Sequence, residues 1–136
     1  MILGIGVDVV ALESFALQLA DRASSFIQGT FTSRELEIIE NRPARDKSPY
    51  YGGRYAAKEA FLKAWSMART GQLPLRPSVS LQEIEVIEDS WRRPQVALHG
   101  QVKTDFEESM GPVQVHLSLS HDGPVATAFV VLEKHR

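Results

Sequence analysis

The chain has 136 residues, no cysteine, and 15 Lys and Arg against 17 Asp and Glu, which gives a formal net charge of −2 at pH 7. This length predicts a single domain over residues 1–136, and the missing cysteines exclude disulfides, thiol catalysis and cysteinyl metal sites. The slightly negative charge gives no general electrostatic attraction for nucleic acid. No apolar run approaches the roughly 20 residues of a membrane span. We therefore expect a cytoplasmic protein that binds neither nucleic acid nor a membrane.

The N-terminal residues MILGIGVDVVAL (1–12) predict a buried strand, because the run is short and rich in Ile and Val. Asp8 is the exception within it. A carboxylate buried among apolar side chains needs a cation, a metal ion or several hydrogen-bond donors to offset its desolvation. Two interpretations of Asp8 stay open at this point: a functional carboxylate, or a structural one that accepts from backbone N–H groups near the strand end.

Helices are predicted after this strand. Residues 13–23 carry apolar side chains at helical spacing, and the TSRE sequence at 32–35 is a capping-box pattern that starts a short helix. A long central helix follows. It begins at Pro49, whose fixed φ suits the first helical position, and it ends near Arg69 with Gly71 as its C-terminal cap.

The central helix has two contrasting faces. At 100° per residue, mostly small apolar residues fall within a stripe about 140° wide, which lets the helix lie close to its neighbours. That stripe consists of Ala57, Ala60, Phe61, Ala64, Trp65 and Ala68. Tyr55, Glu59 and Lys63 follow one another along the opposite side at i, i+4 and i+8. Arg54 projects beside the apolar stripe, where its guanidinium needs an anionic partner or an exposed edge.

The C-terminal half is predicted to be mostly extended. Two strands at 84–88 and 95–99 form a hairpin, a helix at 102–110 is closed by Gly111, and a second hairpin pairs 113–120 with 125–133. A proline-bearing loop at 73–80 precedes them. The order of strand, helices, hairpin, helix and hairpin predicts an α+β fold with a largely antiparallel sheet packed against the long central helix.

Taken singly, the polar residues do not fix a function. Glu59 and Lys63 fit an ordinary solvated ion pair as well as a reactive pair. The hydroxyls and imidazole of Ser118, Ser120 and His121 suit a phosphate, but they also suit the polar face of an edge strand followed by a turn. A Ser-His-Asp hydrolase built from adjacent residues 120–122 is disfavoured, since neighbours in the chain do not converge as a triad does.

Three segments in this order resemble holo-acyl-carrier-protein synthases, the small phosphopantetheinyl transferases. They are GIGVDVV (4–10), RYAAKEAFLKA (54–64) and HLSLSH (116–121), and FTSRE (31–35) is a fourth match. The resemblance covers residues 2 to about 133, nearly the whole chain. Each motif alone is weakly or moderately specific, whereas the set in order is specific.

The resemblance implies transfer of the phosphopantetheine arm of coenzyme A to a serine hydroxyl of apo acyl carrier protein, a step of fatty acid biosynthesis that releases adenosine 3′,5′-bisphosphate. Asp8 and Glu59 match the family's ligands for Mg²⁺, and Glu59 also positions or deprotonates the serine. Lys63 stabilises the departing bisphosphate. Arg54 and His121, helped by the region of Ser118 and Ser120, match positions that contact the coenzyme A phosphates. The family forms a homotrimer with active sites between subunits.

Two departures from the family pattern concern the substrates. Many relatives carry a basic residue just after the first strand that binds the acidic carrier protein, whereas this chain has Glu13 and Ser14 there. Another basic residue would then have to bind the carrier protein: Arg22, Arg34, Arg42 or Arg45. The usual Gly-Thr-Gly after the central helix is replaced by Ala68-Arg69-Thr70-Gly71 and a longer loop. The alternative functions are a Mg²⁺-dependent nucleotide or pyrophosphate hydrolase, and a non-catalytic module that binds carrier protein or nucleotide.

Overall fold

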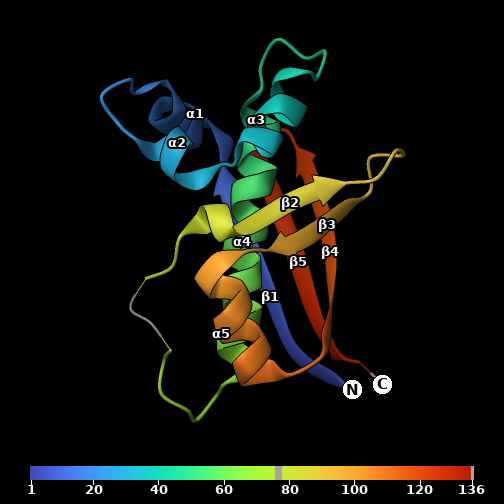
Figure 1. Cartoon of the computed structure of the whole chain (residues 1–136). Helices are drawn as coiled ribbons and strands as arrows, with labels where there is room; N and C mark the ends of the chain where they lie inside the picture. Colours follow the sequence, from blue (N-terminus) through green and yellow to red (C-terminus); the bar gives the residue numbers. More distant parts are fainter. Residues whose placement is uncertain (76–77, 136) are drawn as a thin grey trace.

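The computed structural model describes residues 1–75 and 78–135 (Figure 1). In chain order its elements are β1 (Ile2–Ala11), α1 (Leu12–Ala20), α2 (Phe26–Thr30), α3 (Ser33–Glu40), α4 (Ser48–Ala68), the 3₁₀ turn η1 (Leu81–Glu83), β2 (Ile84–Glu88), β3 (Pro94–Leu98), α5 (Gly100–Met110), β4 (Val113–Asp122) and β5 (Val125–Lys134). The predicted α+β class and element order are confirmed. The short α2 was not predicted, and part of the predicted loop 73–80, residues 76 and 77, lies outside the described residues.

The strands form two antiparallel sheets. One has three strands in the order β1-β5-β4, and the other is the β2–β3 hairpin. In the larger sheet β5 is central, so Val130 lies opposite Gly6 on one side and Leu117 on the other. Because side chains alternate across a strand, Ala126, Ala128, Val130 and Leu132 of β5 all point to the buried face.

Helix α4 packs against that buried face. Ala57, Ala60 and Ala64 of the predicted apolar stripe are fully buried, and so is Ala56, which the prediction did not include. Figure 1 shows α4 between the larger sheet and the β2–β3 hairpin, which crosses the other side of the helix. The helix is therefore covered on two sides, and only its flanks remain for polar chemistry.

A buried ion pair joins α3, α4 and β2. The Lys58 ammonium donates to Glu35 Oε1 at 2.8 Å and to the carbonyl oxygens of Leu81 and Ile84, both at 2.8 Å. Glu35 Oε2 accepts from the Val86 amide at 2.9 Å, and both charged side chains are fully buried. Burial lowers the pKa of Lys58, and the Glu35 carboxylate opposes that effect. Sequence analysis did not identify this pair, although Glu35 also completes the predicted capping box.

The outer face of the larger sheet is exposed, and its β1 and β5 part is apolar. Ile5, Val7 and Val9 of β1 project from it, and Phe129 of β5 lies opposite Val7. These four residues are between 42% and 62% exposed, so none of the described elements covers them fully. Exposed apolar patches of this kind mark interaction surfaces. In the part of the chain that the structure describes, no helix combines the length and apolarity that crossing a membrane demands.

Candidate functional site

Strand β1 presents Asp8 toward α4. Asp8 follows Gly4 and Gly6 on the same face of the strand, while the residues between them point to the opposite face. Lys63 Nζ lies 2.9 Å from Asp8 Oδ1 and 3.1 Å from the carbonyl oxygen of Val7. The buried-strand carboxylate therefore has the cationic partner that its position requires. Within the described residues, Lys63 pairs with Asp8 rather than forming the helical surface pair with Glu59.

Glu59 faces the same open depression as Asp8. The depression has a volume of about 320 Å³ and lies between β1, α1 and α4, with Ser14 and Tyr55 also in its lining. Burial, followed by the charge of Glu59, raises the pKa of the Tyr55 phenol. We call Asp8, Tyr55, Glu59 and Lys63 the carboxylate cluster. It brings together the predicted metal ligands and the predicted catalytic lysine.

A second cluster surrounds Arg54, which is 4% exposed. Arg54 Nη2 lies 3.3 Å from Glu88 Oε2, and Arg42 Nη2 lies 2.7 Å from the same oxygen. Two guanidiniums therefore share one carboxylate, which leaves a net positive charge. The Nε atoms of Arg42 and Arg54 are buried and, among the described residues, have no hydrogen-bond partner. Buried donors without acceptors next to uncompensated charge favour an anionic ligand.

A pocket of about 180 Å³ opens beside these arginines and receives His121 and Ser120 from the end of β4. The His121 ring packs edge-on against Tyr50 with centroids 5.7 Å apart, and the Arg42 guanidinium lies 5.5 Å from the Tyr50 ring. We call Arg42, Arg54, Glu88 and His121 the arginine cluster. Ser118 does not line this pocket; it is exposed on the outer face of β4, opposite Phe129 of β5.

The two clusters lie at opposite edges of the larger sheet. The carboxylate cluster is built on β1, the arginine cluster meets the end of β4, and β5 separates these strands. Their α4 members also leave the helix on different sides, since Arg54 and Lys63 are nine residues apart and so project about 180° from each other. Within one chain, the predicted site residues other than Ser118 are therefore gathered into two groups rather than one.

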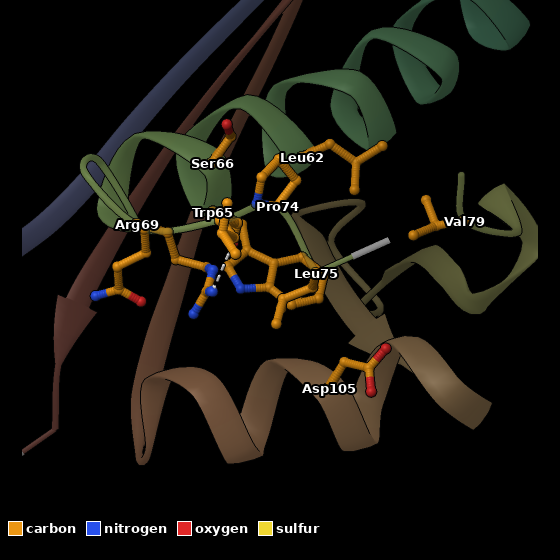
Figure 2. A pocket seen from close by; sticks show the side chains of 10 residues that line it. Leu62, Trp65, Ser66, Arg69, Pro74, Leu75, Val79 and Asp105 are labelled. Atoms are coloured by element: carbon orange, nitrogen blue, oxygen red, sulfur yellow. Dashed lines mark hydrogen bonds between the residues drawn. The ribbon is translucent and has the colours of Figure 1, made fainter. Parts of the chain in front are cut away.

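Another cavity, of about 180 Å³, lies at the C-terminal end of α4. Figure 2 shows Leu62, Trp65 and Ser66 of α4 on one side of it and Asp105 of α5 on another. Arg69 Nη2 donates to the Leu73 carbonyl oxygen at 2.9 Å, which holds the start of the loop that replaces the family's glycine-rich segment. No predicted site residue lines this cavity.

Sequence analysis missed the roles of several residues at these sites. Arg42 was considered only for docking, and Glu88, its partner, was not singled out. The Tyr55 hydroxyl was noted only by its helical spacing from Glu59. Two features of the sequence could have indicated this contact: an acidic residue at the end of a strand, Glu88, and the basic segment that precedes α4. Their meeting depends on how the β2–β3 hairpin crosses α4, which spacing along the chain does not reveal.

The chain is similar to known proteins both in sequence and in structure. The model of the 4′-phosphopantetheinyl transferase superfamily matches residues 4–128. The Nocardia farcinica holo-[acyl-carrier-protein] synthase is 41% identical over 132 residues, covering 97% of this chain and 88% of that protein. A solved Chronobacterium ammoniagenes ACPS–CoA complex has a TM-score of 0.90 at 42% identity, covering 97% of both chains. The Neisseria meningitidis holo-[acyl-carrier-protein] synthase structure has a TM-score of 0.77 at 30% identity, covering 98% and 100%.

These matches span almost the whole chain and include all three segments that carried the resemblance. Among the described residues, no group of three or more His, Cys, Asp or Glu side chains is placed to hold a metal ion. Asp8 and Glu59 are the two carboxylates that line the depression between β1, α1 and α4. The chain belongs to the 4′-phosphopantetheinyl transferase superfamily.

Proposed function

We propose that this protein transfers the 4′-phosphopantetheine arm of coenzyme A to a serine hydroxyl of apo acyl carrier protein and releases adenosine 3′,5′-bisphosphate. The observation that carries the proposal is that Asp8 and Glu59 line one depression and Lys63 pairs with Asp8, in a chain 42% identical to a protein solved as an ACPS–CoA complex. We assign the protein to the cytoplasm, in keeping with its lack of cysteine. We also assign it to fatty acid biosynthesis, on the strength of its likeness to holo-[acyl-carrier-protein] synthases.

Asp8 and Glu59 are suited to hold Mg²⁺. This ion prefers one or two protein carboxylates and takes its remaining ligands from water and substrate phosphates. Both carboxylates line one open depression, which leaves space for those further ligands. When bound, Mg²⁺ supplies Lewis-acid polarisation of the pyrophosphate oxygens.

The protein side chains divide the remaining work. Glu59 orients the incoming serine hydroxyl and accepts its proton, directly or through a water molecule, as the serine oxygen bonds to the phosphorus that carries the pantetheine arm. The bond from that phosphorus to the bridging oxygen breaks, and the bisphosphate leaves. The Lys63 side chain is 55% exposed, so its ammonium can neutralise or protonate the departing oxygen.

The arginine cluster is suited to the phosphate groups at the nucleotide end of coenzyme A. A guanidinium binds phosphate through paired hydrogen bonds, and the buried Nε atoms of Arg42 and Arg54 are donors in need of acceptors. His121 and Ser120 add an imidazole and a hydroxyl to the same pocket. Ser118 precedes Ser120 on β4 and lies outside this pocket. In this proposal Ser118 contributes to the contact between subunits instead.

A homotrimer with active sites between subunits would account for the two separate clusters of site residues in one chain. The carboxylate cluster of one subunit would be completed by the arginine cluster of the next, because the two clusters sit at opposite edges of the sheet. A heterologous contact of this kind closes into a ring when its rotation allows. The exposed Ile5, Val7, Val9 and Phe129 provide apolar surface for that contact.

One assay tests the proposal. Apo acyl carrier protein, coenzyme A and Mg²⁺ are incubated with the enzyme, and mass spectrometry follows the gain of one phosphopantetheine arm on the carrier. Asp8→Ala and Glu59→Ala are expected to abolish transfer while the circular dichroism spectrum is retained. Wild-type turnover by Glu59→Ala in Mg²⁺ would overturn the assignment. Release of adenosine bisphosphate without any carrier protein would favour the hydrolase, and no product at all would favour the binding module.

A further inference from the structure

The turn between β2 and β3, residues 89–93, contains the one non-glycine residue with a positive φ among the residues that the structure describes. That residue is Arg92, whose φ is 62°. The Arg92 amide donates to the Asp89 carbonyl oxygen at 3.0 Å, and the Asp89 amide donates to the Arg93 carbonyl oxygen at 3.2 Å. Short hairpin turns often need one left-handed residue, and glycine is the usual choice because it has no Cβ. An arginine at this position therefore carries a conformational cost.

The Asp89 side chain holds the turn in this shape. Its Oδ1 accepts from the backbone amides of Trp91 at 2.8 Å and Arg93 at 3.0 Å. Its Oδ2 lies 2.6 Å from Arg93 Nε, and the Arg93 guanidinium lies over the Trp91 ring, 5.2 Å from the centroid. Arg92 takes part in none of these side-chain contacts. The turn is thus stabilised by its other residues, and these contacts do not offset the conformational cost of Arg92.

Arg92 lines the pocket beside the arginine cluster. It is exposed, and in the part of the chain that the structure describes its guanidinium forms no ion pair. Arg42 and Arg54, by contrast, share the Glu88 carboxylate. Three arginines therefore line this pocket together with one carboxylate. This excess of positive charge suits a phosphate group, to which a guanidinium donates paired hydrogen bonds.

We propose that Arg92 binds a phosphate group at the nucleotide end of coenzyme A, and that its left-handed conformation serves to keep the guanidinium at the pocket. The inference rests on the proposed function, in which the arginine cluster takes the same end of coenzyme A. Residues held in sparsely populated backbone conformations gather at functional sites, where the conformational cost is part of the mechanism. Because Arg92 has no ion-pair partner among the described residues, binding a phosphate breaks no existing pair.

The test separates the charge of Arg92 from its conformational cost. Arg92→Gln removes the charge and keeps the Cβ, whereas Arg92→Gly removes both. Calorimetric titration with adenosine 3′,5′-bisphosphate in Mg²⁺ buffer is expected to show affinity about tenfold weaker in both variants. In the transfer assay, KM for coenzyme A is expected to rise by a similar factor while kcat changes little. The thermal midpoint is expected to stay the same in Arg92→Gln and to rise by about 2 °C in Arg92→Gly.

Arg93 provides a matched control in the same turn. It carries the same charge as Arg92 but is not among the residues that line the pocket. Arg93→Gln loses the ion pair with Asp89, while the backbone amides at positions 91 and 93 still donate to Asp89 and keep the turn. Bisphosphate affinity in Arg93→Gln is expected to stay within about twofold of wild type, because an exposed charge outside the pocket is largely screened by salt.

Wild-type bisphosphate affinity in both Arg92 variants would overturn the inference. An equal loss in Arg93→Gln would overturn it too, because the effect would then come from the general charge of the turn. A lower thermal midpoint in Arg92→Gly would remove the conformational cost on which the inference depends. The proposed function survives each of these results, because wild-type enzyme still transfers the arm. A wild-type enzyme that transfers no arm and binds no bisphosphate overturns the proposed function, and this inference with it.

Discussion

Gly6 of β1 lies directly against Ala60 of α4: a Cβ built on Gly6 would come within 1.9 Å of the Ala60 carbonyl oxygen. The same holds one turn on, where a Cβ on Gly4 would come within 2.1 Å of the Ala64 carbonyl oxygen. The strand and helix backbones are therefore in contact along this line. Asp8 is the next residue on that face of β1, and the close approach places its carboxylate within reach of the α4 side chains.

Gly6→Ala is expected to destabilise the protein by about 2–3 kcal/mol, because the added methyl group overpacks a backbone contact that cannot yield without moving β1 or α4. Transfer activity is expected to fall as well, since the movement displaces Asp8. Urea unfolding measures the first effect and the transfer assay the second. Gly53→Ala is the control: a Cβ there meets nothing within 4 Å, so the substitution is expected to stabilise α4 by about 0.5–1 kcal/mol. Equal stability of the two variants would contradict the contact.

Lys58→Met is expected to cost about 3–5 kcal/mol in the free energy of unfolding, because it leaves the Glu35 carboxylate buried without its cation. Adding Glu35→Gln removes that charge and is expected to recover part of the loss, since a glutamine can still accept from the Val86 amide. Chemical denaturation of both single variants and the double variant gives the coupling between the two sites. Additive losses would show that the ions act independently.

Val7→Glu is expected to convert the enzyme to monomers without unfolding it, because Val7 is 50% exposed in the single chain and lies in the proposed subunit contact. Light scattering after size-exclusion chromatography gives the mass, and circular dichroism checks the fold. Leu17→Glu is the matched control, since Leu17 is 72% exposed on α1 and away from the sheet. A wild-type protein with monomeric mass would count against shared active sites.

Mixing two inactive variants is expected to restore activity if neighbouring subunits share each site. Asp8→Ala disrupts the carboxylate cluster and leaves the arginine cluster intact. Arg54→Gln disrupts the arginine cluster and leaves the carboxylate cluster intact, and the ion pair between Arg42 and Glu88 is retained. After equimolar mixing under conditions that exchange subunits, about a quarter of the sites combine two intact halves. The transfer assay is therefore expected to show about a quarter of wild-type activity. If no activity returns although native mass spectrometry shows mixed trimers, both clusters belong to a site within one chain.

The sequence by itself was sufficient for the family and for the local elements. The resemblance carried by GIGVDVV, RYAAKEAFLKA and HLSLSH is confirmed, as are the α+β class and the long central helix. The family follows from matching motifs, whereas the local elements depend on periodicity, capping and turn residues over a few positions, which act before any distant contact forms. The capping box at 32–35 and the closing Gly111 are examples, and both are found where they were predicted.

Only the tertiary structure decided which polar groups meet. Nothing along the chain indicates that Lys63 pairs with Asp8, that Arg42 and Arg54 share Glu88, or that Lys58 is buried on Glu35. These partners are separated by 23 to 55 residues, so their contact depends on strand register and on how the β2–β3 hairpin crosses α4. The strand order β1-β5-β4 also separates the two halves of the site, because pairing with β5 sends each half to its own edge.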